Sequence, residues 1–176
     1  MLAGRVFRFC VPGWLARSMH CMSVKQINVR QAHELQQTEN YTYVDVRSVP
    51  EYDKGHPTGA HNVPLLNLDA GMGRMVPNAD FLRVMHANYP ADTKLLIGCQ
   101  VGGRSSQAAQ ILASAGYTDL SNVMGGFGGA RDPSTGQVHA EGWFEAELPV
   151  ETSATPEGSY EAVSYTHLTL PTSDLV

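Results

Sequence analysis

The sequence predicts an α/β fold in three layers, with a central, mostly parallel sheet of about five strands and helices on both faces. The continuous apolar run Leu95, Leu96 and Ile97 is typical of a central strand that is covered on both sides. After a short glycine-bearing loop, apolar residues return at helical spacing from Ala108 to Ala115. Strand-like and helix-like segments alternate along the rest of the chain, and this order favours a parallel sheet.

The other elements are expected to be short. A β-rich run, a helical turn and a further strand precede a loop-like stretch at 65–78, and Asn78 is a candidate N-cap for the helix that follows it. The predicted strands cover residues 27–29, 41–46, 59–63 and 123–124, and the predicted helical segments cover residues 30–37, 51–54 and 79–88.

Length and charge limit the class of protein. The 176-residue chain is long enough for one domain with a full core and too short for two of ordinary size. No apolar run approaches the length of a membrane span, so we expect no membrane partner. The net charge of −5 is uneven, because residues 1–33 hold five basic residues and no acidic ones. The remainder is strongly acidic, which argues against nucleic acid as a partner.

Residues 1–21 have the composition of a leader. Arginines, aromatic residues and small residues without acids resemble a mitochondrial presequence, whereas Arg8 and Pro12 interrupt the apolar stretch that a secretory signal needs. Alternatively, the protein starts at Met22, and residues 1–21 are over-extended translation. We favour this second interpretation. We therefore expect the domain to span residues 22–151 of a cytoplasmic protein, with the mitochondrial matrix as the alternative for a genuine presequence.

Cysteine usage predicts a reducing compartment. Two of the three cysteines, Cys10 and Cys21, fall in the leader, so the folded part holds only Cys99. A single cysteine permits neither a disulfide framework nor a Cys-x-x-Cys zinc pattern. His56 and His61 are flanked by proline and glycine and do not share a helix face, so we expect no metal site and no cofactor.

The loop after the predicted central strand carries the chemistry. Cys99 lies at the carboxyl end of that strand and faces the N-terminus of a helix, where ligands bind in open α/β sheets. Gly102 and Gly103 allow a tight turn and leave the loop interior free of side chains. Consecutive N–H groups and the helix dipole then favour the thiolate, which is the nucleophilic form of the cysteine. Arg104 adds a fixed charge whose planar fork suits oxyanions.

This loop, Cys99-Gln-Val-Gly-Gly-Arg-Ser105, resembles the active-site loop of rhodanese-type sulfurtransferases. Segments 43–47, 51–52 and 55–64 resemble that family's N-terminal motif, and segment 122–127 resembles its closing Gly-Gly motif. The three motifs occur in the family's order across about residues 26–150, and together they are far more specific than any one alone. The chain is therefore identified as resembling a single-domain, rhodanese-like thiosulfate sulfurtransferase.

The resemblance implies a ping-pong transfer of a sulfane sulfur. The Cys99 thiolate would take the sulfur from thiosulfate or another donor, become a persulfide, and pass the sulfur to cyanide, a thiol or a sulfur-acceptor protein. The rest of the loop would bind the substrate: Gln100, Val101, Gly102, Gly103, Arg104 and Ser105. Three further charged residues could be taken for acid–base groups: Asp45, Arg47 and Glu51. A supporting role fits them better, as charges at a strand end that pair with one another and satisfy loop N–H groups.

Two alternatives remain open. Cysteine phosphatases and arsenate reductases also place a cysteine and an arginine around an anion-binding loop, but with a longer spacing than the four residues between Cys99 and Arg104. A domain of this fold can also be a non-catalytic binding or regulatory module, because fold does not imply function. The presence of both Cys99 and Arg104 favours an enzyme, since an inert module has no need of a thiolate site.

The segment after the Gly-Gly motif departs from the family. Many members have a tryptophan where this chain has Ala130, and a polar stretch at 131–141 follows. We predict a surface insertion with a turn near Asp132 and a hairpin arm at Val138, and we assign the packing role of the missing tryptophan to Trp143. The insertion either overhangs the Cys99 loop and selects the acceptor or is a neutral surface loop.

The C-terminal end is expected to lie outside the fold. Residues 152–161 have the composition of a flexible linker without core residues. Residues 163–172 resemble the translation of a sequencing adapter, so we expect residues 162–176 to be a disordered scar.

Overall fold

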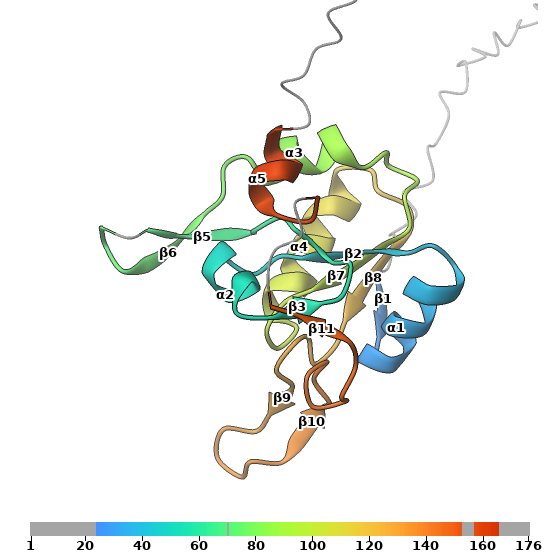
Figure 1. Ribbon diagram of the computed structural model, residues 1–176, viewed down its shortest axis with the longest axis vertical. Helices are drawn as coiled ribbons and strands as arrows, with labels where there is room; N and C mark the ends of the chain where they lie inside the picture. The colour runs from blue at the N-terminus through green and yellow to red at the C-terminus, as the bar shows by residue number, and fades with distance from the viewer. Residues whose placement is uncertain (1–23, 70, 153–156, 166–176) are drawn as a thin grey trace, which may run out of the picture.

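In the computed structural model, the described residues are 24–69, 71–152 and 157–165. A five-stranded sheet in the order β1-β8-β7-β2-β4 forms the centre, and all its neighbouring strands are parallel (Figure 1). This arrangement confirms the predicted α/β class and its parallel sheet. The strands are β1 (Lys25–Ile27), β2 (Thr42–Asp45), β4 (His61–Asn62), β7 (Leu95–Gly98) and β8 (Leu120–Val123).

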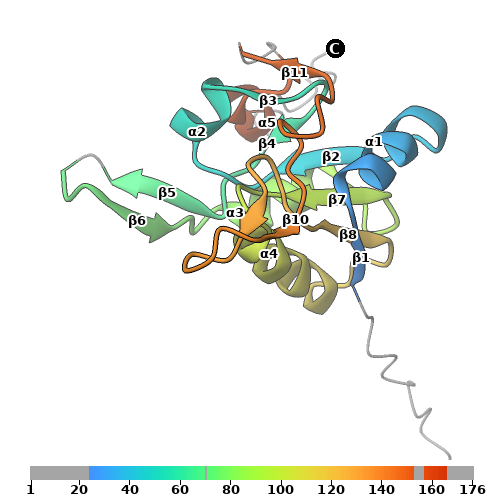
Figure 2. The ribbon, with the colours of Figure 1, turned by 90° about the horizontal axis from the view of Figure 1, so that it is seen from below.

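Helices cover both faces of this sheet (Figures 1 and 2). Because successive strand residues point to opposite faces, Val44 and Tyr43 of β2 enter two different apolar clusters. Side chains of α3, α4 and α5 pack in the cluster of Val44, and side chains of α1 pack in the cluster of Tyr43. The helices are α1 (Val29–Thr38), α2 (Val49–Asp53), α3 (Phe81–Asn88), α4 (Gly103–Ser114) and α5 (Tyr160–Tyr165).

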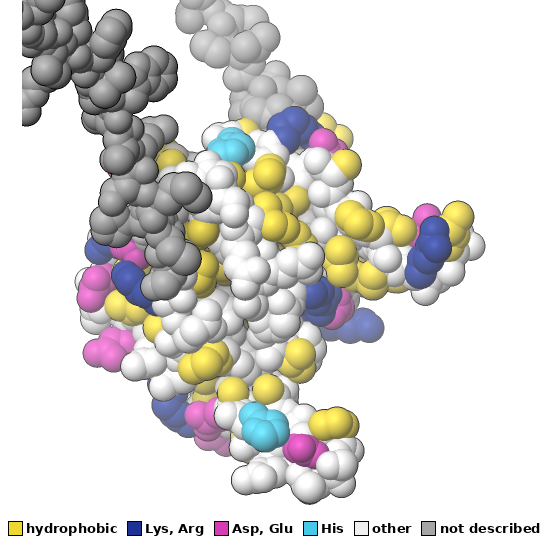
Figure 3. Space-filling view, turned by 180° about the vertical axis from the view of Figure 1, so that it is seen from behind, with side chains coloured by type: hydrophobic (Ala, Val, Ile, Leu, Met, Phe, Trp, Pro, Cys, Tyr) yellow, Lys and Arg dark blue, Asp and Glu magenta, His cyan; other side chains and the backbone are white. Residues whose placement is uncertain are grey.

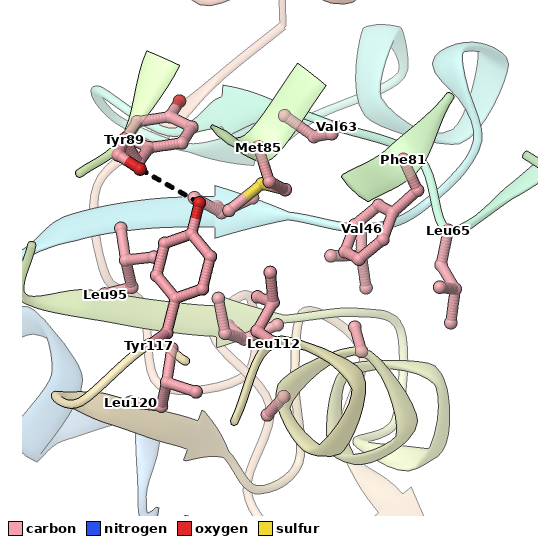
Figure 4. Packing of buried hydrophobic residues seen from close by; sticks show 14 of the residues in the cluster. Val46, Val63, Leu65, Phe81, Met85, Tyr89, Leu95, Leu112, Tyr117 and Leu120 are labelled. Carbon is pink, nitrogen blue, oxygen red and sulfur yellow. Dashed lines mark hydrogen bonds between the residues drawn. The ribbon is translucent and has the colours of Figure 1, made fainter. Parts of the chain in front are cut away.

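The larger cluster fixes the helix that follows the Cys99 loop (Figure 4). Leu95 from β7, Met85 from α3 and Leu112 from α4 are fully buried there. The Tyr117 hydroxyl, also inside the cluster, donates a hydrogen bond to the Tyr89 carbonyl at 2.9 Å. Burial of each such apolar side chain contributes about 1.5–3 kcal/mol, so α4 is held firmly against the sheet.

The first helix begins one residue before its predicted start because side chains cap it. Asn28 accepts a hydrogen bond from the Gln31 N–H at 2.9 Å, and the Gln31 side chain accepts the Asn28 N–H at 3.1 Å. This capping box starts α1 at Val29, so the strand predicted at 27–29 ends two residues earlier.

The cap predicted for the third helix has a different role. The Asn78 side chain accepts the Asp80 N–H at 3.1 Å and donates to the Pro64 carbonyl at 2.8 Å. It therefore ties down the turn that precedes α3, and α3 begins at Phe81 rather than at residue 79.

Two antiparallel hairpins project from the body (Figures 1 and 2). The first joins β5 (Leu66–Asp69) to β6 (Arg74–Pro77), so the prediction of a loop at 65–78 is wrong. The Asp69 carboxylate accepts the N–H groups of Gly71 and Met72 and shapes the turn. Because the hairpin is largely exposed, its residues lack the buried alternation that identifies a strand in sequence.

The second hairpin lies in the predicted insertion and joins β9 (Ala130–Arg131) to β10 (Val138–Ala140), as the turn residues indicated. A further short pair, β3 (His56–Pro57) with β11 (Val150–Glu151), closes the end of the domain. Between these elements Trp143 is fully buried, and its ring packs edge-on against Tyr43 with 5.3 Å between centroids. The packing role predicted for this tryptophan is therefore confirmed.

The C-terminal segment differs from the prediction of a linker followed by a disordered scar. Residues 157–165 pack on the domain, and α5 places Val163, with 4 % of its surface exposed, in the larger cluster. The Asn88 side chain donates to the Val163 carbonyl at 2.8 Å, and the Asn62 N–H donates to the Gly158 carbonyl at 2.8 Å. Composition does not indicate this docking because Val163 and Tyr160 are the apolar residues of the segment that pack on the larger cluster.

The predicted leader at 1–21 and the end of the predicted scar at 166–176 lie outside the described residues. No helix in the described part of the chain is both long and apolar enough to cross a membrane.

Candidate active site

Cys99 follows β7 directly and lies at the carboxyl edge of the sheet, just before α4 begins. Only 2 % of the residue is exposed. Its sulfur accepts the Gly102 N–H at 3.1 Å and lies 3.4 Å from the Ser105 hydroxyl, which donates toward it. The sulfur is therefore buried but faces polar donors, as a site that stabilises a negative sulfur requires.

The N-terminus of α4 supplies further donors. Gly102 is the N-cap residue, with φ of +106°, and no side chain caps the helix. The first N–H groups of a helix have no acceptor within that helix, and the helix dipole adds partial positive charge at the same end. An anion on the Cys99 sulfur would therefore meet unpaired N–H groups and a favourable field.

The two glycines of the loop are not equivalent. Gly102 needs its positive φ, which other L-residues rarely adopt, whereas a Cβ added at Gly103 would meet no atom within 4 Å. The backbone conformation of the loop therefore requires a glycine at 102, and no such requirement exists at 103.

Ser105 is fully buried beneath the loop. Its hydroxyl lies 3.0 Å from the Gly102 carbonyl and 3.4 Å from the Cys99 sulfur. Because a hydroxyl has one proton, it shares that proton between the two acceptors and can turn toward the sulfur as negative charge accumulates there.

The turn after β8 packs against the back of the Cys99 loop. The Phe127 N–H donates to the Cys99 carbonyl and the Gly128 N–H donates to the Gln100 carbonyl, both at 2.8 Å. Gly126 has φ of +55°, and a Cβ added there would lie 2.2 Å from the Cys99 carbonyl oxygen. The closing Gly-Gly motif therefore allows two backbones to touch behind the cysteine.

A buried ion pair supports the loop from the other side. Arg47 and Asp45 are both almost fully buried, with 2.6 Å between Nη2 and Oδ2. The Arg47 guanidinium also donates to the Gly55 carbonyl at 2.8 Å and to the Gln100 side chain at 3.2 Å. It lies 4.4 Å from the centre of the Phe127 ring. The pairing predicted for Asp45 and Arg47 is present, and it links both motifs that flank the loop.

Two residues predicted to bind substrate point elsewhere. The Gln100 side chain accepts from Arg47, and its Nε2 lies so near Gly128 that a Cβ added to that glycine would come within 2.1 Å of it. Val101 has 53 % of its surface exposed. The Gln100 side chain thus supports the loop, and the Val101 side chain lies at the surface.

Arg104 also differs from the prediction. Its two terminal nitrogens each donate to a Glu51 carboxylate oxygen at 2.7 Å, so the fork expected for an oxyanion is occupied by Glu51. Ser48 donates to the same carboxylate through its N–H and its hydroxyl. The Arg104 guanidinium, with help from Ser48, lowers the pKa of Glu51 from 4.5 to about 2, although burial opposes this shift.

Sequence reasoning assigned no role to two residues that complete the support. The Asn62 side chain donates to the carbonyls of Asp45 and Arg47, each at 3.0 Å, and the Phe127 ring covers the Arg47 guanidinium. Both residues lie within the family-like segments 55–64 and 122–127. Their residue types alone do not indicate what they contact. Within the described residues, no three His, Cys, Asp or Glu side chains gather as metal ligands would.

A parallel sheet with a cysteine loop at its carboxyl edge and a Gly-Gly turn behind it defines a class of domain. The chain belongs to the rhodanese-like domain family, whose sequence model matches residues 28–131.

Relatives agree with this assignment. Rhodanese-like domain-containing protein 15, chloroplastic, of Arabidopsis thaliana is 38% identical over 125 residues, covering 71% of this chain and 60% of that protein. Thiosulfate sulfurtransferase 16, chloroplastic, of the same plant is 37% identical over 101 residues, covering 57% of this chain and 82% of the relative. The crystal structure of Rv0390 from M. tuberculosis has a TM-score of 0.60 at 28% identity, covering 74% of this chain and 98% of that one.

Gly126→Ala tests the contact behind the cysteine. The added methyl group would collide with the Cys99 carbonyl, whereas Gly136→Ala at a similar φ of +71° meets no atom within 4 Å. Both variants carry the cost of a left-handed alanine, about 1–2 kcal/mol, and we expect Gly126→Ala to lose about 2 kcal/mol more in urea unfolding. Its Cys99 should also react faster with iodoacetamide. Equal losses in the two variants would contradict the contact.

Glu51→Gln tests the pair with Arg104. Because the pKa of Glu51 is lowered to about 2, its ionised form stabilises the fold fully above pH 4.5, and this contribution disappears as the pH falls toward 2. After allowance for solvent screening, we expect the variant to lose about 1 kcal/mol of unfolding free energy at pH 7 and progressively less below pH 4.5. Asp80→Asn, which breaks an exposed pair with Arg83, is the control and should change little. A loss that is independent of pH would refute the assignment.

Proposed function

We propose that this protein is a rhodanese-type sulfurtransferase in which Cys99 carries the transferred sulfur as a persulfide. The observation that carries the proposal is the position of the Cys99 sulfur, which accepts the Gly102 N–H at the uncapped start of α4. A buried cysteine without such donors would serve as a small apolar residue. The name of one relative, Thiosulfate sulfurtransferase 16, supports the same chemistry.

In the loading step the Cys99 thiolate attacks the outer sulfur of thiosulfate. A bond forms between the two sulfurs, the sulfur–sulfur bond of thiosulfate breaks, and sulfite leaves with the electron pair of that bond. The product is the Cys99 persulfide anion. Its outer sulfur would carry the charge toward the N–H groups at the start of α4, which lower the energy of that anion.

In the discharge step a thiol attacks the outer sulfur of the persulfide. The new sulfur–sulfur bond forms on the acceptor, and the bond to Cys99 breaks with its electron pair on the Cys99 sulfur. The thiol proton ends on the new acceptor persulfide, and the Cys99 thiolate is regenerated. Ser105 and Gly102 would hold that thiolate for the next cycle, because both donate toward the sulfur.

The alternatives fit the site less well. In a phosphatase or arsenate reductase the loop arginine would bind the oxyanion, whereas Arg104 is held by Glu51 through both terminal nitrogens. A purely binding module does not require donors aimed at a cysteine sulfur. A reducing compartment suits a free thiol, and we retain the cytoplasm as its predicted location, although the plant relatives are named as chloroplastic.

The mass of the protein after incubation with thiosulfate tests the proposal. We expect one added sulfur, located on the Cys99 peptide, that cyanide removes with formation of thiocyanate. Cys99→Ala should take up no sulfur, with activity at least about 10³-fold lower, because the covalent intermediate is lost. Cys10→Ser and Cys21→Ser are the matched controls and should load normally.

The same preparations distinguish the alternatives. Failure of the wild type to load sulfur from any sulfane donor would favour a binding module. Release of phosphate from an aryl phosphate, or reduction of arsenate, by the wild type but not by Cys99→Ala would favour the oxyanion enzymes.

A further inference from the structure

Large apolar side chains of the Cys99 loop, of the turn after β8 and of the β5–β6 hairpin are exposed. Val101 is a loop residue with 53 % of its surface exposed, and Met124, which is also exposed, is near the loop, since a Cβ added at Gly102 would lie 3.9 Å from the Met124 Cα. Leu68 and Met75 stand opposite each other on β5 and β6 with 48 % and 38 % of their surfaces exposed. Figure 3 shows hydrophobic side chains along this projecting hairpin. Single exposed apolar side chains are ordinary, whereas apolar side chains that are exposed together mark a binding surface.

A groove of about 360 Å³ lies between α2 and the β5–β6 hairpin. Its apolar walls are Leu68 and Met75 on the hairpin and Pro50 on α2. Glu51 and Arg104 line it as well, paired with each other at 2.7 Å. We call this space the hairpin groove.

The hairpin groove adjoins the Cys99 loop through Arg104. Arg104 lines the groove and lies in the first turn of α4, and the next residue, Ser105, donates toward the Cys99 sulfur at 3.4 Å. On the proposed function, a molecule whose sulfur reaches Cys99 would extend its other end past Arg104 toward Pro50 and the hairpin.

The chemistry of the groove favours an aliphatic ligand. The charges of Glu51 and Arg104 satisfy each other, so an anion would have to compete with Glu51 for the guanidinium. Lys54 also lines the groove, but it is exposed, and solvent and salt screen its charge. Ser48 also lines the groove, and its N–H and its hydroxyl both donate to Glu51. The remaining contact surface is the cross-strand pair Leu68–Met75 and Pro50, which gains free energy only by covering apolar groups.

We infer that the hairpin groove binds the aliphatic chain of a low-molecular-weight thiol that serves as the sulfur acceptor. The inference rests on the proposed function for its reaction, which is the discharge step in which the acceptor takes the outer sulfur and Cys99 leaves as thiolate. It adds the class of acceptor, and it identifies Leu68 and Met75 as residues that determine specificity. Thiols with long aliphatic chains are then better acceptors than short or strongly polar ones.

Discharge of the Cys99 persulfide by two neutral thiols tests this inference. We would compare 3-mercaptopropanol with 6-mercaptohexanol, which differ by three methylene groups and share a terminal hydroxyl. Each methylene buried in an apolar site favours binding by up to about fourfold, so the longer thiol should have a kcat/KM at least about tenfold higher. A ratio below about twofold would overturn the inference.

Variants on the hairpin assign the selectivity to the groove. In the double variant Leu68→Ser/Met75→Ser the ratio should fall to about twofold or less, because the apolar wall is lost. Met72→Ser is the matched control, since Met72 is on the same hairpin with 65 % of its surface exposed and does not line the groove. Its ratio should match that of the wild type. Cyanide is too small to reach the hairpin, so its rate should be equal in all three proteins and reports an intact site.

Alkylation of Cys99 separates failure of this inference from failure of the proposed function, because it requires no sulfur transfer. N-hexylmaleimide should modify the Cys99 peptide faster than N-methylmaleimide, after correction for their rates with free cysteine, and the double variant should lose this preference. Chain-length selectivity in alkylation without persulfide formation would refute the proposed sulfurtransferase function and support binding of aliphatic chains in the hairpin groove. Persulfide formation without chain-length selectivity in either reaction would refute the groove and leave the sulfurtransferase standing.

Discussion

The structure depends on one close contact between two backbones behind Cys99. The Cys99 carbonyl accepts the Phe127 N–H at 2.8 Å, and only a residue without a side chain fits at Gly126. This contact joins the loop after β7 to the turn after β8 and fixes the Cys99 backbone. The sulfur is held where the Gly102 N–H and the start of α4 meet it. An anion-stabilising site within a core is costly, and such packing keeps it in place.

The charges around the loop serve mainly to position it. Burying the Asp45–Arg47 pair costs free energy of desolvation, which hydrogen bonds to the buried charges offset. The Arg47 guanidinium donates such bonds to Asp45, Gly55 and Gln100. The pair of Arg104 with Glu51 likewise fixes α2 to the first turn of α4. Arg104 therefore connects the cysteine loop to the hairpin groove. In the proposed reaction, the field of the helix terminus and the N–H groups, more than a free cation, would stabilise a negative charge on the sulfur.

The sequence predicted the parts that follow a strong local pattern. The apolar run at 95–97, the glycine loop and the helical stripe predicted β7, α4 and the place of Cys99, and the ordered motifs indicated the family. It did not predict the β5–β6 hairpin, whose exposed faces lack a buried alternation, or the docking of Val163. The partner of Arg104 was also missed, because Glu51 lies far from it in sequence and long-range pairing leaves no periodic signal. Two of these features, the hairpin and the pair of Arg104 with Glu51, line the groove that is proposed to bind the acceptor.

If the Cys99 loop stabilises a negatively charged sulfur against the N–H groups at the start of α4, a crystal of the protein soaked in thiosulfate should show it. We expect one additional sulfur bonded to the Cys99 Sγ and directed toward the N–H groups of residues 102–105. A Cys99 side chain that stays unmodified at saturating thiosulfate, or an added sulfur turned away from those N–H groups into the apolar core, would contradict it.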